Sequence, residues 1–330
     1  MNLTLVELLV AMVVFVFLLA GVLKIYLSSM ISDRVLTSEA RMQENGRFAM
    51  HFLTHDIRMA GYMGCASFNR ITPNVIATFP SQAPAFTSAD IIQGLDYTTT
   101  STWPGNFPSQ PSNIVPNTSV ILLQFGSSAG AHLTGNVDPT NSNMQVTHNA
   151  DNWVQGSYVL ITDCSSADLF RNTNTMQSSN KTNPVTLSYG KGQMNTTNRL
   201  SRNYGRDLYY IGTDSQDGNR PALYRLDVYG NKQALVDNVQ SMKILYGVDT
   251  DGDHAANEYL TAAQVNAISP SSNGWPDVVS VRVNLLVAST DDNLAPSKQT
   301  VTFATAQYAA SDRRLYWTFG DTITLRNRTN

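Results

Sequence analysis

Residues 3–23 read LTLVELLVAMVVFVFLLAGVL, and Glu7 is the only charged residue among them. As an α-helix at about 1.5 Å per residue, this segment is roughly 31 Å long, which matches the hydrocarbon core of a bilayer. No Lys or Arg precedes it, no small-residue cleavage site ends it, and Lys24 follows directly. The segment is therefore predicted to be a retained membrane anchor and not a removable signal peptide.

Glu7 is an unusual residue in such a segment. A carboxylate inside an apolar helix is unfavourable and indicates a partner or a function. The alternative is that Glu7 lies at headgroup level and neutralises the positive end of the helix dipole.

The remaining composition indicates an exported globular protein. The chain has 330 residues, of which 42% are hydrophobic and only 14% are charged, so it can form a large core. Lys and Arg number 22 against 25 Asp and Glu, which gives a net charge of -3. This balance disfavours a dedicated nucleic-acid binder.

The helix is predicted to continue beyond the anchor as an amphipathic rod. Apolar residues recur at helical spacing between charged ones: Ile31, Val35, Met42, Ala49 and Leu53. Gly61 supplies a stop signal after about Ala60. We expect a transmembrane helix at residues 1–27, its amphipathic continuation at 28–62, and a globular antiparallel β domain at 63–330.

The β domain is predicted from short runs of β-branched and aromatic residues. They are Val120–Phe125, Tyr158–Thr162, Asp207–Gly212, Leu223–Val228, Met242–Val248, Val278–Ala288, Thr300–Phe303 and Leu315–Leu325. The clearest run, Val278–Ala288, alternates so that one face is buried. Asp217, Gly218 and Asn219 predict a hairpin turn.

Long polar stretches around residues 72–118, 126–152 and 165–200 are predicted to be loops. The helix and strand patterns do not alternate, so a doubly wound α/β fold is disfavoured. We expect an α+β fold, in which one long N-terminal helix packs on an antiparallel sheet with long loops.

The chain has two cysteines, Cys65 and Cys164. In an anchored protein whose bulk faces an oxidising compartment, we expect them to form one disulfide. The alternative is two unpaired thiols in a cytosolic protein. Neither cysteine lies in a CxxC motif, so a structural zinc site has no support.

The order of motifs along the chain resembles type IV pilins. Leu3–Ala11 is similar to the start of mature pilins and pseudopilins, in which an acid at the fifth mature position begins a long apolar helix. Further segments resemble the PilW family of minor pilins: Gln43–Ala49, Asp56–Tyr62, Gly64–Cys65, Tyr246–Asp253, Val281–Leu286 and Thr324–Arg328.

This resemblance implies a role in pilus assembly and not catalysis. PilW-like proteins wait in the inner membrane, with their bulk in the periplasm, and then join other minor pilins at the pilus tip to prime growth. Implied partners are other minor pilins, the major pilin, the inner-membrane assembly machinery and a PilY-type tip adhesin, with no specific nucleic acid. Twitching motility, adhesion and DNA uptake are the implied pilus functions. Glu7 is expected to pair with the N-terminal amine of an adjacent subunit.

The start of the chain departs from the family pattern. Pilin precursors carry a basic leader that ends in Gly, whereas only Met1 and Asn2 precede Leu3 here. The candidate processing site lies between Asn2 and Leu3. We expect the start to be trimmed and replaced, or the start codon to be misplaced; a chain that stays unprocessed is the third reading.

One acidic loop is a candidate calcium site. Asp249, Asp251 and Asp253 alternate around Gly252, and Glu258 follows closely. Ca²⁺ prefers oxygen ligands of this kind, although the positions of Gly252 and Glu258 match an EF-hand only in part. The alternative is a solvated turn that is capped by its Asp side chains. No other cofactor is expected.

Three weaker patterns point elsewhere. Gly126–Gly130 fits G-x-S-x-G around Ser128, but loop residues follow it where a hydrolase needs a helix. His51 and His55 have a metal-binding spacing without a third ligand, so a helical surface pair is preferred. We expect four arginines near the C-terminus to serve subunit contacts: Arg313, Arg314, Arg326 and Arg328.

Two alternative functions remain. The protein could be a pseudopilin of a type II secretion system or a membrane-anchored hydrolase.

Overall fold

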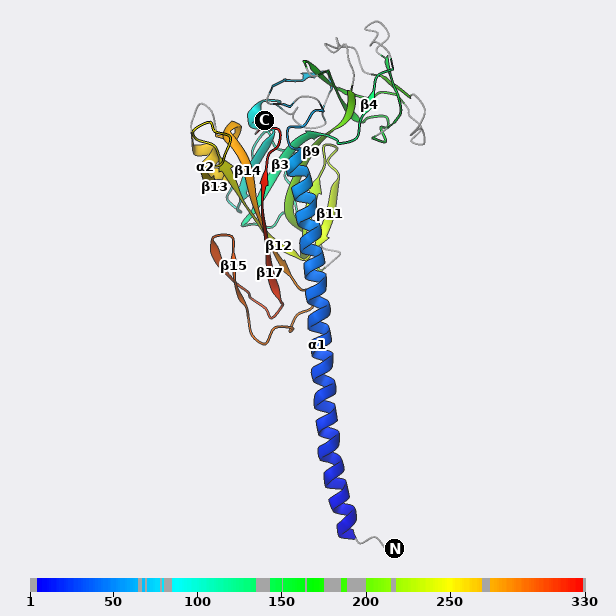
Figure 1. Ribbon diagram of the computed structural model, residues 1–330, viewed down its shortest axis with the longest axis vertical. Coiled ribbons are helices and arrows are strands. Elements are labelled where there is room, and N and C mark those ends of the chain that lie inside the picture. Colours follow the sequence, from blue (N-terminus) through cyan, green and yellow to red (C-terminus); the bar gives the residue numbers. More distant parts are fainter. Residues whose placement is uncertain are drawn as a thin grey trace.

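The computed structural model describes residues 5–64, 67–68, 70–77, 79, 85–134, 143–149, 151–163, 165–174, 185–188, 200–214, 218–268 and 274–328. One long helix, α1, carries a β-rich head around its C-terminal half, while its N-terminal half extends away from the head (Figure 1). The C-terminus lies in the head, at the opposite end of the molecule from the N-terminus.

Helix α1 spans Leu5–Met59, which corresponds to about 82 Å. Its buried residues all lie in the second half and recur mostly three or four positions apart: Ser38, Met42, Gly46, Ala49, Leu53, Asp56 and Ile57. This spacing places them on one stripe, as the amphipathic pattern predicted, although Ile31 is exposed. Gly61 follows the helix with a φ of +77°, a conformation that glycine adopts without strain.

The larger sheet has nine strands, and all its pairs are antiparallel except β1 with β7. Its strands are β1 (Asn74–Val75), β2 (Ile92–Tyr97), β3 (Thr118–Gly126), β4 (Ala131–His132), β6 (Tyr158–Thr162), β7 (Ala167–Arg171), β9 (Leu200–Asp214), β10 (Arg220–Leu226) and β11 (Lys232–Asp237). Strand β9 joins the parts of this sheet, because it pairs with β6 near its start and with β3 and β10 further on. The antiparallel β9–β10 pairing confirms the predicted hairpin, although Asp217 of its turn lies outside the described residues.

The second sheet has four strands in the order β13-β12-β14-β17. These are β12 (Val239–Val248), β13 (Glu258–Leu260), β14 (Val278–Ala288) and β17 (Tyr316–Thr324). The predicted buried face of β14 is confirmed, since Val279, Val281, Val283, Leu285 and Val287 are all buried. Smaller elements are β5 (Asn143–Val146), β8 (Val185–Ser188), β15 (Thr300–Phe303), β16 (Ala306–Ala309), α2 (Ala262–Ala267), η1 (Ser88–Asp90) and η3 (Trp275–Asp277).

The main core lies where the two sheets and α1 meet. Leu53 of α1, Tyr209 of β9, Met242 of β12, Leu285 of β14 and Ile323 of β17 belong to one fully buried cluster. Strands β14 and β17 of the smaller sheet contact α1, and so do β3 and β11 of the larger one. The head thus holds the second half of the helix from two sides.

The predicted long loops contain more strands than expected. Strand β2 lies within residues 72–118, β4 and β5 lie within 126–152, and β7 lies within 165–200. The loop prediction was wrong there because polar residues such as Gln93 and Asp168 interrupt the short apolar runs. Pairing with β3 and β6 nevertheless stabilises β2 and β7, and this tertiary contribution overrides weak local propensity.

Candidate assembly surface and side-chain clusters

The head does not cover the N-terminal half of α1. Every residue from Leu5 to Arg34 is exposed, including large apolar side chains such as Phe17 at 75% and Ile25 at 73%. Water contact with so much apolar surface is unfavourable, at roughly 25 cal/mol per Å². This half of the helix therefore needs lipid or other helices around it, and its first part is long and apolar enough to cross a membrane.

Glu7 lies in the first turn of this bare segment. A carboxylate there is favourable for the helix dipole, because the first amide groups of a helix carry partial positive charge. It is also the only ionisable side chain from Leu5 to Leu23. Any environment that covers this part of the helix must also accommodate the Glu7 carboxylate.

The second half of α1 is fixed to the head by close packing and hydrogen bonds. Gly46 lies against the Phe319 ring of β17, where a Cβ atom would come within 2.3 Å of the ring. At the C-terminal end of α1, Asn327 Nδ2 donates to the Ala60 carbonyl at 2.8 Å, and the Gly61 amide donates to the Gln124 carbonyl at 2.8 Å. The head is therefore packed along the second half of the helix, from Ser38 to its end.

A polar cluster lies where the end of α1 meets β9 and β10; its members Asp56, Asp207 and Tyr209 are buried, while His55 is exposed. The Tyr209 hydroxyl donates to the Asp56 carboxylate, and His55 Nδ1 lies 2.6 Å from the same carboxylate. Asp207 pairs with Arg225 at 3.6 Å. Burial raises the pKa of Asp207 to about 7; Arg225 opposes this rise, and the negative charge of Asp56 adds to it.

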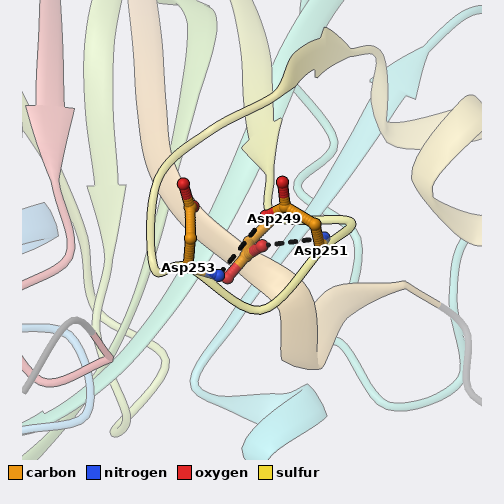
Figure 2. Close-up of side chains that lie close together, drawn as sticks. All are labelled: Asp249, Asp251 and Asp253. Carbon is orange, nitrogen blue, oxygen red and sulfur yellow. Dashed lines mark hydrogen bonds between the residues drawn. The ribbon is translucent and has the colours of Figure 1, made fainter.

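Three aspartates meet in the loop between β12 and β13 (Figure 2). Ligand oxygens of Asp249, Asp251 and Asp253 lie within 4.8 Å of one another. Asp249 Oδ1 accepts hydrogen bonds from the amides of Asp251 at 3.1 Å and Gly252 at 2.7 Å, and its Oδ2 accepts one from His254 at 2.8 Å. Asp249 thus organises the turn and can offer an ion only its remaining lone pairs.

The hydrogen bonds of this loop also affect the pKa of Asp249. Desolvation alone would raise the pKa of Asp249, but the amides of Gly252, His254 and Asp251 outweigh it and hold that pKa below its ordinary value. Glu258 stands at the start of β13 and is not part of the group of three. Among the described residues, this is the one cluster of three such side chains close enough to surround a metal ion.

Four predicted site residues lie outside the described residues: Asn2, Leu3, Cys65 and Cys164. The processing site and the disulfide therefore stay predictions.

The C-terminal arginines do not form one surface patch. Arg328 is buried, and its Nη1 donates to the carbonyls of Trp275, Pro276 and Val278, while its Nη2 donates to that of Ser88. Burial lowers the pKa of Arg328 to about 9. The expectation that Arg328 serves subunit contacts was wrong, because this guanidinium ties the chain end to η1 and η3.

The described residues do not bring together an active site around Ser128 or a metal site around His51 and His55. Strand β4, and not a helix, follows the Ser128 loop. The carbonyls of Ser127, Ser128 and Ala129 all accept from Arg202 Nη1, which fixes the loop as a structural turn. On α1, His55 is engaged by Asp56.

Sequence reasoning missed the buried Asp56 cluster and the Gly46 contact. One signal for each was present, since both residues fall on the apolar stripe of the amphipathic helix, where a carboxylate needs a partner and a glycine allows a close approach.

The exposed, apolar first half of α1 continues directly into a second half that packs on antiparallel sheets. This architecture defines a pilin-like protein. Residues 208–327 match the family model of PilW, Type IV Pilus-assembly protein W. This match supports a PilW-family, pilin-like protein that is involved in type IV pilus assembly, as the motifs indicated. The matched range runs from within β9 through β17 and includes the Asp249 loop. No curated protein and no solved structure matches the chain.

Proposed function

We propose that the protein is a minor pilin that joins other minor pilins in a complex at the pilus tip and primes assembly. One observation carries this proposal: the thirty exposed residues from Leu5 to Arg34 continue directly into a half-helix that the head covers. A helix built in this way can leave a bilayer and pack among similar helices, because both surroundings are apolar.

The location and partners follow from the same helix. Before assembly the protein would sit in the inner membrane with its head in the periplasm, and after assembly it would belong to the pilus at the cell surface. The proposed partners are other minor pilins, the major pilin, the inner-membrane assembly machinery and a PilY-type tip adhesin. A specific nucleic acid is not proposed, since the net charge is -3 and Arg328 is used inside the head.

Glu7 is proposed to direct subunit assembly. In a helix bundle, a carboxylate surrounded by apolar side chains is strongly unfavourable unless a cation compensates it. The N-terminal amine of an adjacent subunit is the cation that we propose.

Gene deletion followed by complementation tests the role, with surface pili, twitching and secreted enzymes scored separately. We expect deletion to abolish or strongly reduce pili and twitching while secretion stays normal. Loss of secretion with normal pili would instead identify a pseudopilin of a type II secretion system.

We propose that the protein is not an enzyme, and one matched variant tests this. Complementation with Ser128→Ala should restore pili fully, because the Ser128 backbone carbonyl, and not its side chain, holds Arg202. A Ser128→Ala protein that is stable but fails to restore function would revive the hydrolase hypothesis.

A further inference from the structure

A pocket of about 360 Å³ opens between the loop Pro108–Ser112, the middle of β9 and the turn from β10 to β11. Arg206 and Lys232 bring positive charge to its wall, and Tyr229 brings an aromatic ring. This volume lies at the small end of the range for ligand pockets, about 300–1,000 Å³. None of these residues belongs to the α1 surface described above.

Arg206 is a buried cation that forms no direct ion pair among the described residues. The residue is only 4% exposed, and no carboxylate within the described residues forms an ion pair with it. Its Nη2 donates to the Asn106 carbonyl, while its buried Nε has no hydrogen-bond partner among those residues. The Asp90 carboxylate acts on Arg206 electrostatically without forming an ion pair with it, so an anion in the pocket would further compensate a charge that the fold balances only in part.

The single acid in the pocket wall does not supply that compensation. Asp227 Oδ1 accepts hydrogen bonds from the amides of Tyr229 at 2.9 Å and Asn231 at 2.8 Å, and its Oδ2 accepts from Asn231 Nδ2 at 3.0 Å. The carboxylate thus serves to shape the turn. Lys232 is exposed at the start of β11, so the wall carries two cations against one occupied carboxylate.

The Tyr229 ring is held firmly while part of it stays open. It stacks on the Tyr158 ring with centroids 5.4 Å apart, and its hydroxyl accepts a hydrogen bond from the Tyr158 amide at 3.1 Å. Tyr229 nevertheless remains 43% exposed. An immobilised aromatic surface with an open side offers a platform for an apolar ring face at low entropic cost.

The Pro108–Ser112 loop gives the pocket polar side chains. Ser109, Gln110 and Ser112 supply hydroxyl and amide groups, of which Gln110 Nε2 donates to the Tyr97 hydroxyl at 3.1 Å. Trp103 Nε1 fixes this loop by donating to the Pro108 carbonyl at 2.8 Å. The pocket therefore combines a cationic wall, an aromatic platform and several neutral hydrogen-bonding groups.

We propose that this pocket binds a small carboxylated saccharide, with the carboxylate toward Arg206 and Lys232 and a face of the sugar ring on Tyr229. A sugar fits better than an acidic peptide, because its C–H face matches the aromatic platform and its hydroxyls match the Ser and Gln side chains. This inference goes beyond a role in pilus assembly and does not depend on it.

The test uses the full purified chain in detergent and D-glucuronate as the probe, with affinity measured by ligand-observed NMR at low ionic strength. We expect saturable binding with a Kd in the millimolar range, about 1 mM. Glucose, the neutral analogue, should bind at least about tenfold more weakly, which corresponds to the loss of one charged contact. No glucuronate binding at about 10 mM, or equal binding of glucose, would overturn the proposal.

Two variants locate the site. Lys232→Glu, at an exposed position, should weaken glucuronate binding at least about tenfold without changing the melting temperature. Arg206→Gln should do the same, and its melting temperature shows whether the buried position tolerates the change. Unchanged affinity in Lys232→Glu overturns the proposed site even if Arg206→Gln fails to fold. Stronger binding of an Asp-Asp dipeptide than of glucuronate would overturn the saccharide in favour of an acidic peptide.

Discussion

Gly46 of α1 lies in direct contact with the ring of Phe319 on β17, and a Cβ atom at position 46 would come within 2.3 Å of that ring. Helix propensity alone predicts that Gly46→Ala stabilises the protein by about 1 kcal/mol. We expect the opposite, a loss of about 1–3 kcal/mol, because the helix must move away from the sheet. Urea unfolding of the purified protein measures the difference.

Gly21→Ala is the matched control, since nothing lies within 4 Å of a Cβ atom at that position of the same helix. It should leave the stability of the head unchanged. Combining Gly46→Ala with Phe319→Leu should recover part of the loss, because the smaller side chain makes room. A Gly46→Ala variant as stable as the wild type would contradict the close approach.

Asp207 predicts an unusual pH dependence of stability. Its pKa of about 7 in the folded protein lies above the value of about 3.9 expected in the unfolded chain. Between these values the folded state binds more protons, so this group's stabilisation is complete below about pH 4 and is lost as pH rises toward 7. Asp207→Asn removes this dependence, which amounts to at most about 4 kcal/mol.

Unfolding free energies from pH 4 to 8 measure the effect. Asp237→Asn changes an exposed acid and is the control, whose profile should follow the wild type. Parallel profiles for Asp207→Asn and wild type would show that Asp207 ionises normally in the folded head.

The Asp249 loop predicts stabilisation by calcium. Carboxylates of Asp249, Asp251 and Asp253 repel one another within 4.8 Å, and a divalent cation would relieve that repulsion. At a concentration of about 100 times its Kd, bound Ca²⁺ would add about 2.7 kcal/mol, which a thermal melt detects. Asp253→Asn should reduce the shift, while Glu258→Gln, outside the cluster of three, should reduce it less. No shift in the wild type would identify a turn that needs no ion.

Features that depend on residues close in sequence could be predicted. The apolar segment that starts α1 and the apolar face of β14 are local patterns, and both match the structure, although Ser280 and Leu286 on the other face of β14 are buried as well. Strands β2 and β7 were missed because their stability comes from neighbours that the local pattern does not show. The bond between Tyr209 and Asp56 joins residues 153 positions apart, and Arg206 becomes a candidate ligand only once the folded head buries it.

Glu7→Ala separates membrane insertion from assembly. Insertion should persist, because the change removes a charge from an apolar segment. Incorporation into pili should fall by at least about 100-fold, since losing one partner of a buried charge pair costs about 3 kcal/mol or more. Immunoblots of sheared pili and of inner membranes measure both quantities, with Asp33→Ala, an acid outside the apolar segment, as the control. Normal incorporation of Glu7→Ala alongside normal Asp33→Ala would show that the Glu7 carboxylate is tolerated at the membrane surface and has no partner in the filament.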